Sequence, residues 1–149
     1  MSKYYELVVF TAGLKDYADW ILNDFDRQGF ISHRLYRDHT KYRNGVYVKD
    51  LSKLGRDLHK TLIIDNIEEN FCAQPDNGIP IKGWYNDPTD RELEKMGNFL
   101  KDMAVRRVKD VRPEIRMFRA SHPPAHIIGT SGSPTHVAWA NRKMNQQNQ

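Results

Sequence analysis

The feature that most constrains the fold of this chain is a short apolar run, Thr61–Ile64, that ends abruptly in Asp65 and Asn66. The run is continuous in hydrophobic residues rather than alternating, as in a parallel strand that is buried on both faces of a sheet. A second run, Tyr4–Phe10, is rich in aromatic and β-branched residues and leads directly into Thr11. Ligands of open α/β sheets bind at the carboxyl ends of the strands. We therefore expect the residues after these two strands to lie at a binding edge.

The polar residues after the apolar runs allow two interpretations. Lys49 and Asp50 close another short apolar run, Val46–Val48. A lysine, a carboxylate and an amide at neighbouring strand ends could hold a phosphate and a hard cation together. Asp-Asn after a strand is also ordinary turn chemistry, because both side chains bond to nearby backbone groups and tolerate left-handed geometry. The Asp-Asn pair alone does not decide between a turn and a metal site.

The remaining pattern predicts helices and a hairpin around these strands. Apolar residues at helical spacing predict helices over Leu14–Gln28 and Asp90–Met103. An Asn-Gly pair, the strongest short hairpin signal, lies between Leu35–Arg37 and Val46–Val48. We expect these two segments to be the arms of a hairpin-like excursion that returns at Lys49. Together the elements predict an α/β fold.

The length and the charge distribution limit the class of protein. A chain of 149 residues is long enough for one domain. Lys and Arg number 9 against 3 Asp and Glu in residues 101–149, but 14 against 16 in residues 1–100. A mildly acidic body argues against a fold built for direct contact with nucleic acid. We predict a domain over residues 1–119 and a tail over 120–149 whose polar, proline- and glycine-containing composition favours disorder.

The sequence gives few signals for membrane insertion or export. No run of about 18 apolar residues predicts a membrane span, and the start, Met-Ser-Lys, lacks the apolar core of a secretory signal. Cys72 is the only cysteine, so an internal disulfide cannot form, which fits a reducing compartment. We therefore expect an intracellular protein, nuclear or cytoplasmic.

The elements form an ordered series: a strand ending in Thr-Ala, a helix, a hairpin, Lys-Asp-Leu, and a strand ending in Asp-Asn. This series resembles the small phosphatases of the RNA polymerase II C-terminal domain, a branch of the haloacid-dehalogenase superfamily. The resemblance covers about residues 4–103. The segments that carry it are Glu6–Leu14, Tyr17–Asp19, Arg34–Arg37, Tyr47–Ser52, Ile63–Asn66 and Gly83–Tyr85. Several segments in the same order make it more specific than any single motif.

The resemblance implies a fold, a reaction and a set of roles. The fold would be a haloacid-dehalogenase-like (Rossmannoid) parallel sheet with a β-hairpin insertion. The reaction would be Mg²⁺-dependent hydrolysis of phosphoserine peptides, such as the polymerase C-terminal domain, through a phospho-aspartyl intermediate. Thr11 matches the hydroxyl that binds phosphoryl oxygens, and Lys49 matches the lysine that neutralises phosphate. Asp65 and Asn66 match the magnesium motif, and Arg37 matches a basic position near the phosphopeptide entrance.

The chain departs from the family at the nucleophile. The family's nucleophile lies in an Asp-x-Asp-x-Thr motif at the end of a central apolar strand, some tens of residues before the position of Thr11. Only ten residues precede Thr11, and none is Asp. The one Asp-x-Asp, at 24–26, falls at the end of a predicted helix. Either the true start lies upstream and the sequence is truncated, or the chain is an inactive remnant. Both explanations predict that the chain as given does not hydrolyse phosphate esters.

Two further expectations follow from the resemblance. The phosphatase-like receptor subunit of the mitochondrial inner-membrane translocase shares this fold and binds presequences, and Val108–Pro113 is similar to it. That alternative would place the protein in mitochondria, and a non-catalytic interaction scaffold is a third class. Without the central strand, the inner edges of the strands before Thr11 and Asn66 lack a partner. We expect the gap to stay empty, to close, or to be filled by another chain.

Overall fold

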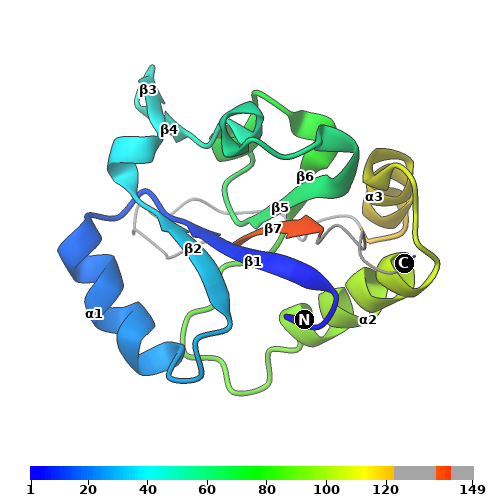
Figure 1. Cartoon of the computed structure of the whole chain (residues 1–149), viewed down its shortest axis with the longest axis horizontal. Helices are drawn as coiled ribbons and strands as arrows, with labels where there is room; N and C mark the ends of the chain where they lie inside the picture. Colours follow the sequence, from blue (N-terminus) through cyan, green and yellow to red (C-terminus); the bar gives the residue numbers. More distant parts are fainter. Residues whose placement is uncertain (123–136, 142–149) are drawn as a thin grey trace, which may run out of the picture.

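A five-stranded sheet in the order β2-β1-β7-β5-β6 organises the structure (Figure 1). The computed structural model describes residues 1–122 and 137–141. The strands of this sheet are β1 (Tyr5–Phe10), β2 (Ile31–Leu35), β5 (Thr61–Asp65), β6 (Gly78–Pro80) and β7 (Val137–Asn141). The helices are α1 (Lys15–Phe25), α2 (Glu92–Val105) and α3 (Val111–Ser121). The result is a mixed α/β architecture, as the sequence predicts.

The two predicted strands are present and buried. β1 pairs with β2 in parallel and β5 pairs with β6 in parallel. All five residues of β5 are buried, which explains why its sequence is continuous in apolar residues. The helices also lie where we predict them, but α1 ends at Phe25 rather than Gln28 and α2 begins at Glu92 rather than Asp90.

The central position of the sheet is occupied by the chain's own C-terminal segment. β7 lies between β1 and β5 and runs antiparallel to both (Figure 1). Val137 pairs with Val9 of β1 and with Ile64 of β5, so one strand bonds both inner edges. The expectation that the gap stays empty, closes or is filled by another chain is therefore wrong, because a segment of the same chain fills it. The physical reason is that buried strand edges need hydrogen-bond partners, and a segment tethered to the same chain can supply them.

The predicted tail differs from the structure at two places. α3 extends to Ser121, past the expected boundary at residue 119. β7 shows that Val137–Asn141 is a strand of the main sheet, so the prediction of disorder is wrong for these five residues. The rest of the predicted tail, 123–136 and 142–149, lies outside the described residues.

Helices cover one face of the sheet in two places (Figure 1). Val9 packs with Ala18 and Leu22 of α1. A larger cluster joins the strands to α2 and α3, and includes Leu7, Leu62, Ile64, Met96, Leu100 and Ile115. Buried Tyr5 donates a hydrogen bond to the carbonyl of Leu100 at 2.7 Å, and burial raises the pKa of this tyrosine to about 12. These contacts fix α2 against β1.

The opposite face is covered by irregular chain. Phe10, Leu51, Ile63 and Phe71 form its buried cluster. A two-stranded hairpin, β3 (Lys41–Arg43) with β4 (Val46–Val48), precedes this segment and projects from the body (Figure 1).

The hairpin turns at the Asn-Gly pair, where Asn44 and Gly45 both have positive φ, 48° and 84°. Both central residues of a type I′ turn need positive φ, so the Asn-Gly pair suits this position. The second arm is as we predict, but the first arm is Lys41–Arg43. Leu35 belongs to β2, Tyr36 precedes a short 3₁₀ turn, and Arg37 is the first residue of that turn.

Candidate functional site

The candidate residues gather at the carboxyl edge of the sheet. β1 and β5 are both antiparallel to β7, so they run in the same direction and end at the same edge. Thr11 follows β1, while Asp65 is the last residue of β5. One strand separates β1 from β5, which puts their axes about 9–10 Å apart. The residues at this edge can therefore face one ligand of phosphate size with its substituent.

Lys49 and Asp65 form a buried ion pair. Lys49 Nζ lies 2.6 Å from Asp65 Oδ2, and both side chains are fully inaccessible to solvent. Asp65 also accepts the backbone N–H of Ile67 at 2.9 Å and the Nδ2 group of Asn70 at 3.2 and 3.3 Å. The Lys49 backbone N–H donates to the carbonyl of Asn70 at 2.6 Å. Asn70 thus holds both partners in place.

The pair is electrostatically unusual because it is dry. Burial lowers the pKa of Lys49 from 10.5 to about 8, although the Asp65 carboxylate acts in the opposite direction. A lysine with this pKa is still mostly protonated at neutral pH. Two charges without water are stable only when their geometry and hydrogen bonds are good. A buried cation at the end of a strand is a prepared position for an anionic group.

Thr11 is held by the turn that leaves β1. Its backbone N–H donates to the carbonyl of Leu35 at 2.9 Å, and its Oγ1 accepts the N–H of Gly13 at 2.9 Å. A Cβ at Gly13 would lie 3.1 Å from this hydroxyl, so a larger residue would crowd it. The Thr11 hydroxyl is therefore held by the turn, and because it accepts from Gly13 its own proton is left to donate.

Arg37 reaches the same turn from the next segment. Its Nε donates to the carbonyl of Ala12 at 2.7 Å, and its backbone N–H donates to the carbonyl of Gly13 at 3.0 Å. The guanidinium lies over the ring of Tyr47, 4.8 Å from the centroid, which is a cation–π contact. The structure thus brings Arg37 beside the Thr11 turn, at the base of the hairpin.

Asn66 is the residue that fits a hard cation. Its Oδ1 is buried and has no hydrogen-bond partner in the part of the chain that the structure describes. A neutral oxygen in this state is a ligand that Mg²⁺ accepts, usually beside one carboxylate, water and phosphate oxygens. Within residues 1–122 and 137–141, no three His, Cys, Asp or Glu side chains form a metal-binding group. Of the two residues that the resemblance assigns to a cation, Asn66 has an unbonded oxygen, whereas Asp65 is bonded to Lys49 and Asn70.

Two groups at this edge were not found from the sequence. Asn70 bonds Asp65, yet it lies five residues after the strand in a stretch with only loop signals. Tyr47 was assigned to a hairpin strand without a role for its ring. Neither contact has a local signal, because both depend on how the chain returns to the edge after β4 and β5.

The Asp-x-Asp at 24–26 does not take part in this site. Asp24 is exposed and pairs with Arg27. Asp26 follows α1 and accepts the N–H groups of Phe30 and Ile31 at 2.8 and 2.9 Å. Both carboxylates are thus occupied by the turn between α1 and β2, at the end of the helix remote from Thr11.

The fold and the site define an α/β domain with a buried lysine–carboxylate pair at the carboxyl edge of its sheet. A sequence model of the NLI interacting factor-like phosphatases matches residues 1–112. The chain therefore belongs to the NLI interacting factor-like phosphatase family, which confirms the resemblance to the small C-terminal-domain phosphatases.

Individual relatives fall into two groups. CTD small phosphatase-like protein 2 of Dictyostelium discoideum is 47% identical over 116 residues, 78% of this chain and 20% of that protein. The human carboxy-terminal domain RNA polymerase II polypeptide A small phosphatase 2 is 38% identical over 120 residues, 80% of this chain and 44% of that protein. The mitochondrial import inner membrane translocase subunit TIM50 of Candida glabrata is 41% identical over 119 residues, 79% of this chain and 24% of that protein.

The chain spans less than half of the length of each of these relatives. Among the helices that the structure describes, none combines the length and the hydropathy needed to cross a membrane.

Proposed function

We propose that this chain is a phosphoserine-peptide-binding domain of the phosphatase family that takes Mg²⁺ and does not hydrolyse phosphate esters by itself. The observation that carries the proposal is the buried Lys49–Asp65 pair, with 2.6 Å between Nζ and Oδ2, at the edge where Thr11 and Asn66 also lie. Phosphate recognition mostly needs positioned positive charge and hydrogen-bond donors rather than covalent chemistry from the protein. The edge supplies both.

Each residue has a role in this proposal. Lys49 turns its ammonium group from Asp65 to the phosphate, and the Thr11 hydroxyl donates to a second phosphate oxygen. Arg37, on the Ala12 carbonyl beside this turn, meets the peptide's charge at the entrance. Asp65 and Asn66 would hold Mg²⁺, which when bound neutralises phosphate charge. The orphan Oδ1 of Asn66 supports this assignment.

The absence of turnover rests on the lack of a nucleophile. The 149 residues contain no Asp-x-Asp-x-Thr. The single Asp-x-Asp lies at the end of α1, where its second carboxylate accepts hydrogen bonds from the turn that follows. Among the described residues, the carboxylate in contact with Lys49 is Asp65, which is also needed for the cation. Loss of a covalent nucleophile typically costs many orders of magnitude in rate.

The test is an assay of the purified chain with an aryl phosphate and millimolar Mg²⁺. We expect no hydrolysis above the protein-free rate. Mg²⁺-dependent hydrolysis that Lys49→Ala abolishes would contradict the proposal, because it would mean that another carboxylate acts as nucleophile. The variant Lys101→Ala, at an exposed position of α2, is the matched control for loss of one lysine.

The translocase relatives favour a second candidate, a presequence-binding receptor domain. The TIM50 subunits of Candida glabrata and Aspergillus fumigatus are 41% and 40% identical to this chain, close to the values for the phosphatases. Presequences are basic amphipathic helices, whereas a phosphoserine peptide is anionic. Fluorescence anisotropy with one labelled peptide of each kind separates the candidates. Binding of the basic peptide alone would favour the receptor and a mitochondrial location over a nuclear or cytoplasmic one.

A further inference from the structure

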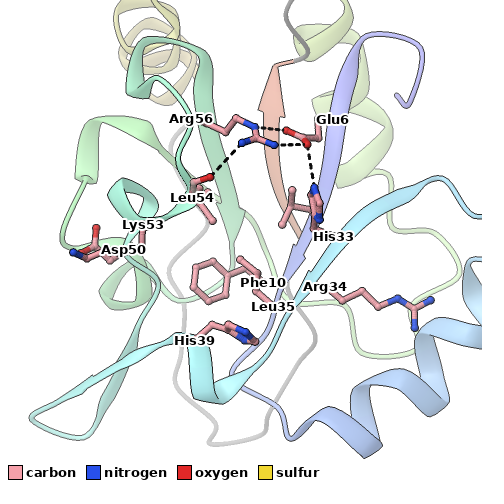
Figure 2. Close-up of a pocket in the computed structure, with 11 residues that line it drawn as sticks. Glu6, Phe10, His33, Arg34, Leu35, His39, Asp50, Lys53, Leu54 and Arg56 are labelled. Atoms are coloured by element: carbon pink, nitrogen blue, oxygen red, sulfur yellow. Dashed lines mark hydrogen bonds and ion pairs between the residues drawn. The ribbon is translucent and has the colours of Figure 1, made fainter.

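A cavity of about 400 Å³ lies on the face of β1 and β2 that α1 does not cover (Figure 2). Side chains alternate between the two faces of a strand. Val9 therefore packs against α1, while Val8 and Phe10 line the cavity on the other side. Leu54, from the chain that follows Lys49 and Asp50, forms a further wall. The volume is in the range of sites for small molecules.

The middle of the cavity is apolar. Val8, Phe10, Leu35 and Leu54 line it. Figure 2 shows Phe10 and Leu35 side by side below Leu54, with the charged group Arg56, Glu6 and His33 at one end and His39 at the other. Apolar walls with a few polar groups at the ends are typical of sites that orient a small ligand.

The two carboxylates of the lining are already satisfied. Glu6 accepts Nε and Nη2 of Arg56 at 2.8 Å each and lies 3.3 Å from Nε2 of His33. The hydrogen bond from Arg56 is the main reason that the pKa of Glu6 is lowered. Asp50 accepts the hydroxyl of Ser52 at 2.7 Å and the amide of Gln74 at 2.8 Å. The hydroxyl of Ser52 is the main cause of the lowered pKa of Asp50. Neither carboxylate needs a ligand.

The groups that remain are hydrogen-bond donors. Lys53 forms no ion pair within 4.0 Å among residues 1–122 and 137–141, although its charge contributes to the lowered pKa of Asp50. His39 accepts the backbone N–H of Tyr36 on Nδ1 at 3.0 Å, so its neutral ring carries the proton on Nε2. A cavity whose acceptors are occupied and whose free groups are donors is complementary to an anion.

We propose that this cavity is a binding site for a small organic anion with a compact apolar body, such as an aryl or short alkyl carboxylate. The apolar body lies against Phe10, Leu35 and Leu54, and the anionic group meets Lys53 and His39. The site is separate from the Lys49–Asp65 pair, and its ligand differs from a phosphoserine peptide in needing an apolar body. The inference therefore does not depend on phosphate binding.

The experiment is a titration of the ¹⁵N-labelled full chain with 4-phenylbutyrate, followed by amide chemical shifts. We expect shifts at Val8, Phe10, Leu35 and Leu54, with a Kd of about 1–10 mM for a ligand of this size. The neutral analogue 4-phenylbutan-1-ol has the same apolar body. It should bind at least about threefold more weakly, because it lacks the charge that Lys53 meets.

Two variants distinguish binding in the cavity from nonspecific binding to the surface. Lys53→Gln should weaken 4-phenylbutyrate about three- to fivefold and leave 4-phenylbutan-1-ol unchanged. Lys101→Gln, which removes the same charge from exposed α2, should change neither ligand. Equal binding of the two ligands, equal effects of the two variants, or shifts confined to the exposed aromatic residues Trp20 and Phe25 of α1 would overturn the proposal.

Discussion

Replacement of Lys49 by methionine should destabilise the domain severely, and a second substitution should repair part of the loss. Lys49→Met keeps the length of the side chain but leaves Asp65 buried without its counter-charge. Asp65 still has the N–H of Ile67 and the amide of Asn70. Removing one partner of a buried ion pair typically costs about 3–5 kcal/mol. That is a large share of the roughly 5–15 kcal/mol that stabilises a domain.

The double variant Lys49→Met/Asp65→Asn distinguishes an ion pair from simple packing. Both charges are gone, and the asparagine oxygen can still accept the N–H of Ile67. We therefore expect the double variant to be about 2 kcal/mol more stable than Lys49→Met alone, because the uncompensated charge is removed. Asp65→Asn alone should be the milder single change, since a lysine whose pKa is already near 8 can lose its proton.

The assay is urea denaturation of the four proteins at pH 7, followed by far-UV circular dichroism. The free energy of unfolding comes from linear extrapolation, with a constant slope as the check that the variants share one fold. A Lys49→Met variant within about 1 kcal/mol of the parent would refute the reasoning. A double variant that is less stable than both single variants would refute it as well.

Three further predictions concern pH, the central strand and one glycine. Lys49 has a pKa of about 8 when folded and 10.5 as its ordinary value, so unfolding is accompanied by proton uptake between these pH values. The parent's stability relative to Lys49→Met should be level below pH 8 and rise by up to about 3 kcal/mol towards pH 10.5 in urea titrations. Ala138→Pro removes a backbone donor from the middle of β7 and should lower the free energy of unfolding by at least about 1–3 kcal/mol, whereas an unchanged melt would show that β7 does not complete the sheet. A Cβ at Gly78 would lie 2.1 Å from the ring of Phe71, so Gly78→Ala should destabilise the domain by more than about 2 kcal/mol. Gly97→Ala inside α2 should instead stabilise it by up to about 1 kcal/mol. Calorimetry that ranks the two variants equally would contradict this.

The parts of the fold that could be predicted are those with a strong local pattern. β1 and β5 are continuous apolar runs, so burial on both faces follows from composition alone. The sequence predicts Asp65 at the carboxyl edge because it ends a buried strand. The contact with Lys49 does not follow from one sheet, because Lys49 comes after β4 of the separate β3-β4 hairpin. Asn70 could not be predicted, because its position depends on the irregular chain after Asp65.

β7 could not be predicted, because its strand conformation depends on its neighbours. Val137–Asn141 is five residues long and lies in a region rich in polar residues, glycine and proline. Its conformation is set by hydrogen bonds to β1 and β5, which are more than seventy residues away in sequence. Strand propensity depends strongly on such context. An argument from local pattern therefore assigns this segment to a tail.

The apolar residues whose spacing predicts α1 are not all buried. Tyr17 and Phe25 have helical spacing with the buried residues Ala18 and Leu22, yet they are 57% and 78% exposed. α1 packs beside β2, the outermost strand on this side of the sheet, so only the narrow stripe at Ala18 and Leu22 meets the core. Helical periodicity gives the direction of a face but not how much of it the neighbouring strands cover.

The most direct test of the proposed function is a comparison of phosphorylated and unphosphorylated forms of one serine peptide by isothermal titration calorimetry. The full chain is titrated with and without Mg²⁺, beside Thr11→Val and the control Lys101→Gln. We predict at least about tenfold tighter binding of the phosphorylated form, strengthened by Mg²⁺, since a charge-assisted hydrogen bond contributes about 1.5–3 kcal/mol. Thr11→Val should lose most of this preference, whereas Lys101→Gln should keep it. Equal affinity for the two peptides, or a preference that Thr11→Val leaves intact, would contradict the assignment of the carboxyl edge as a phosphate site.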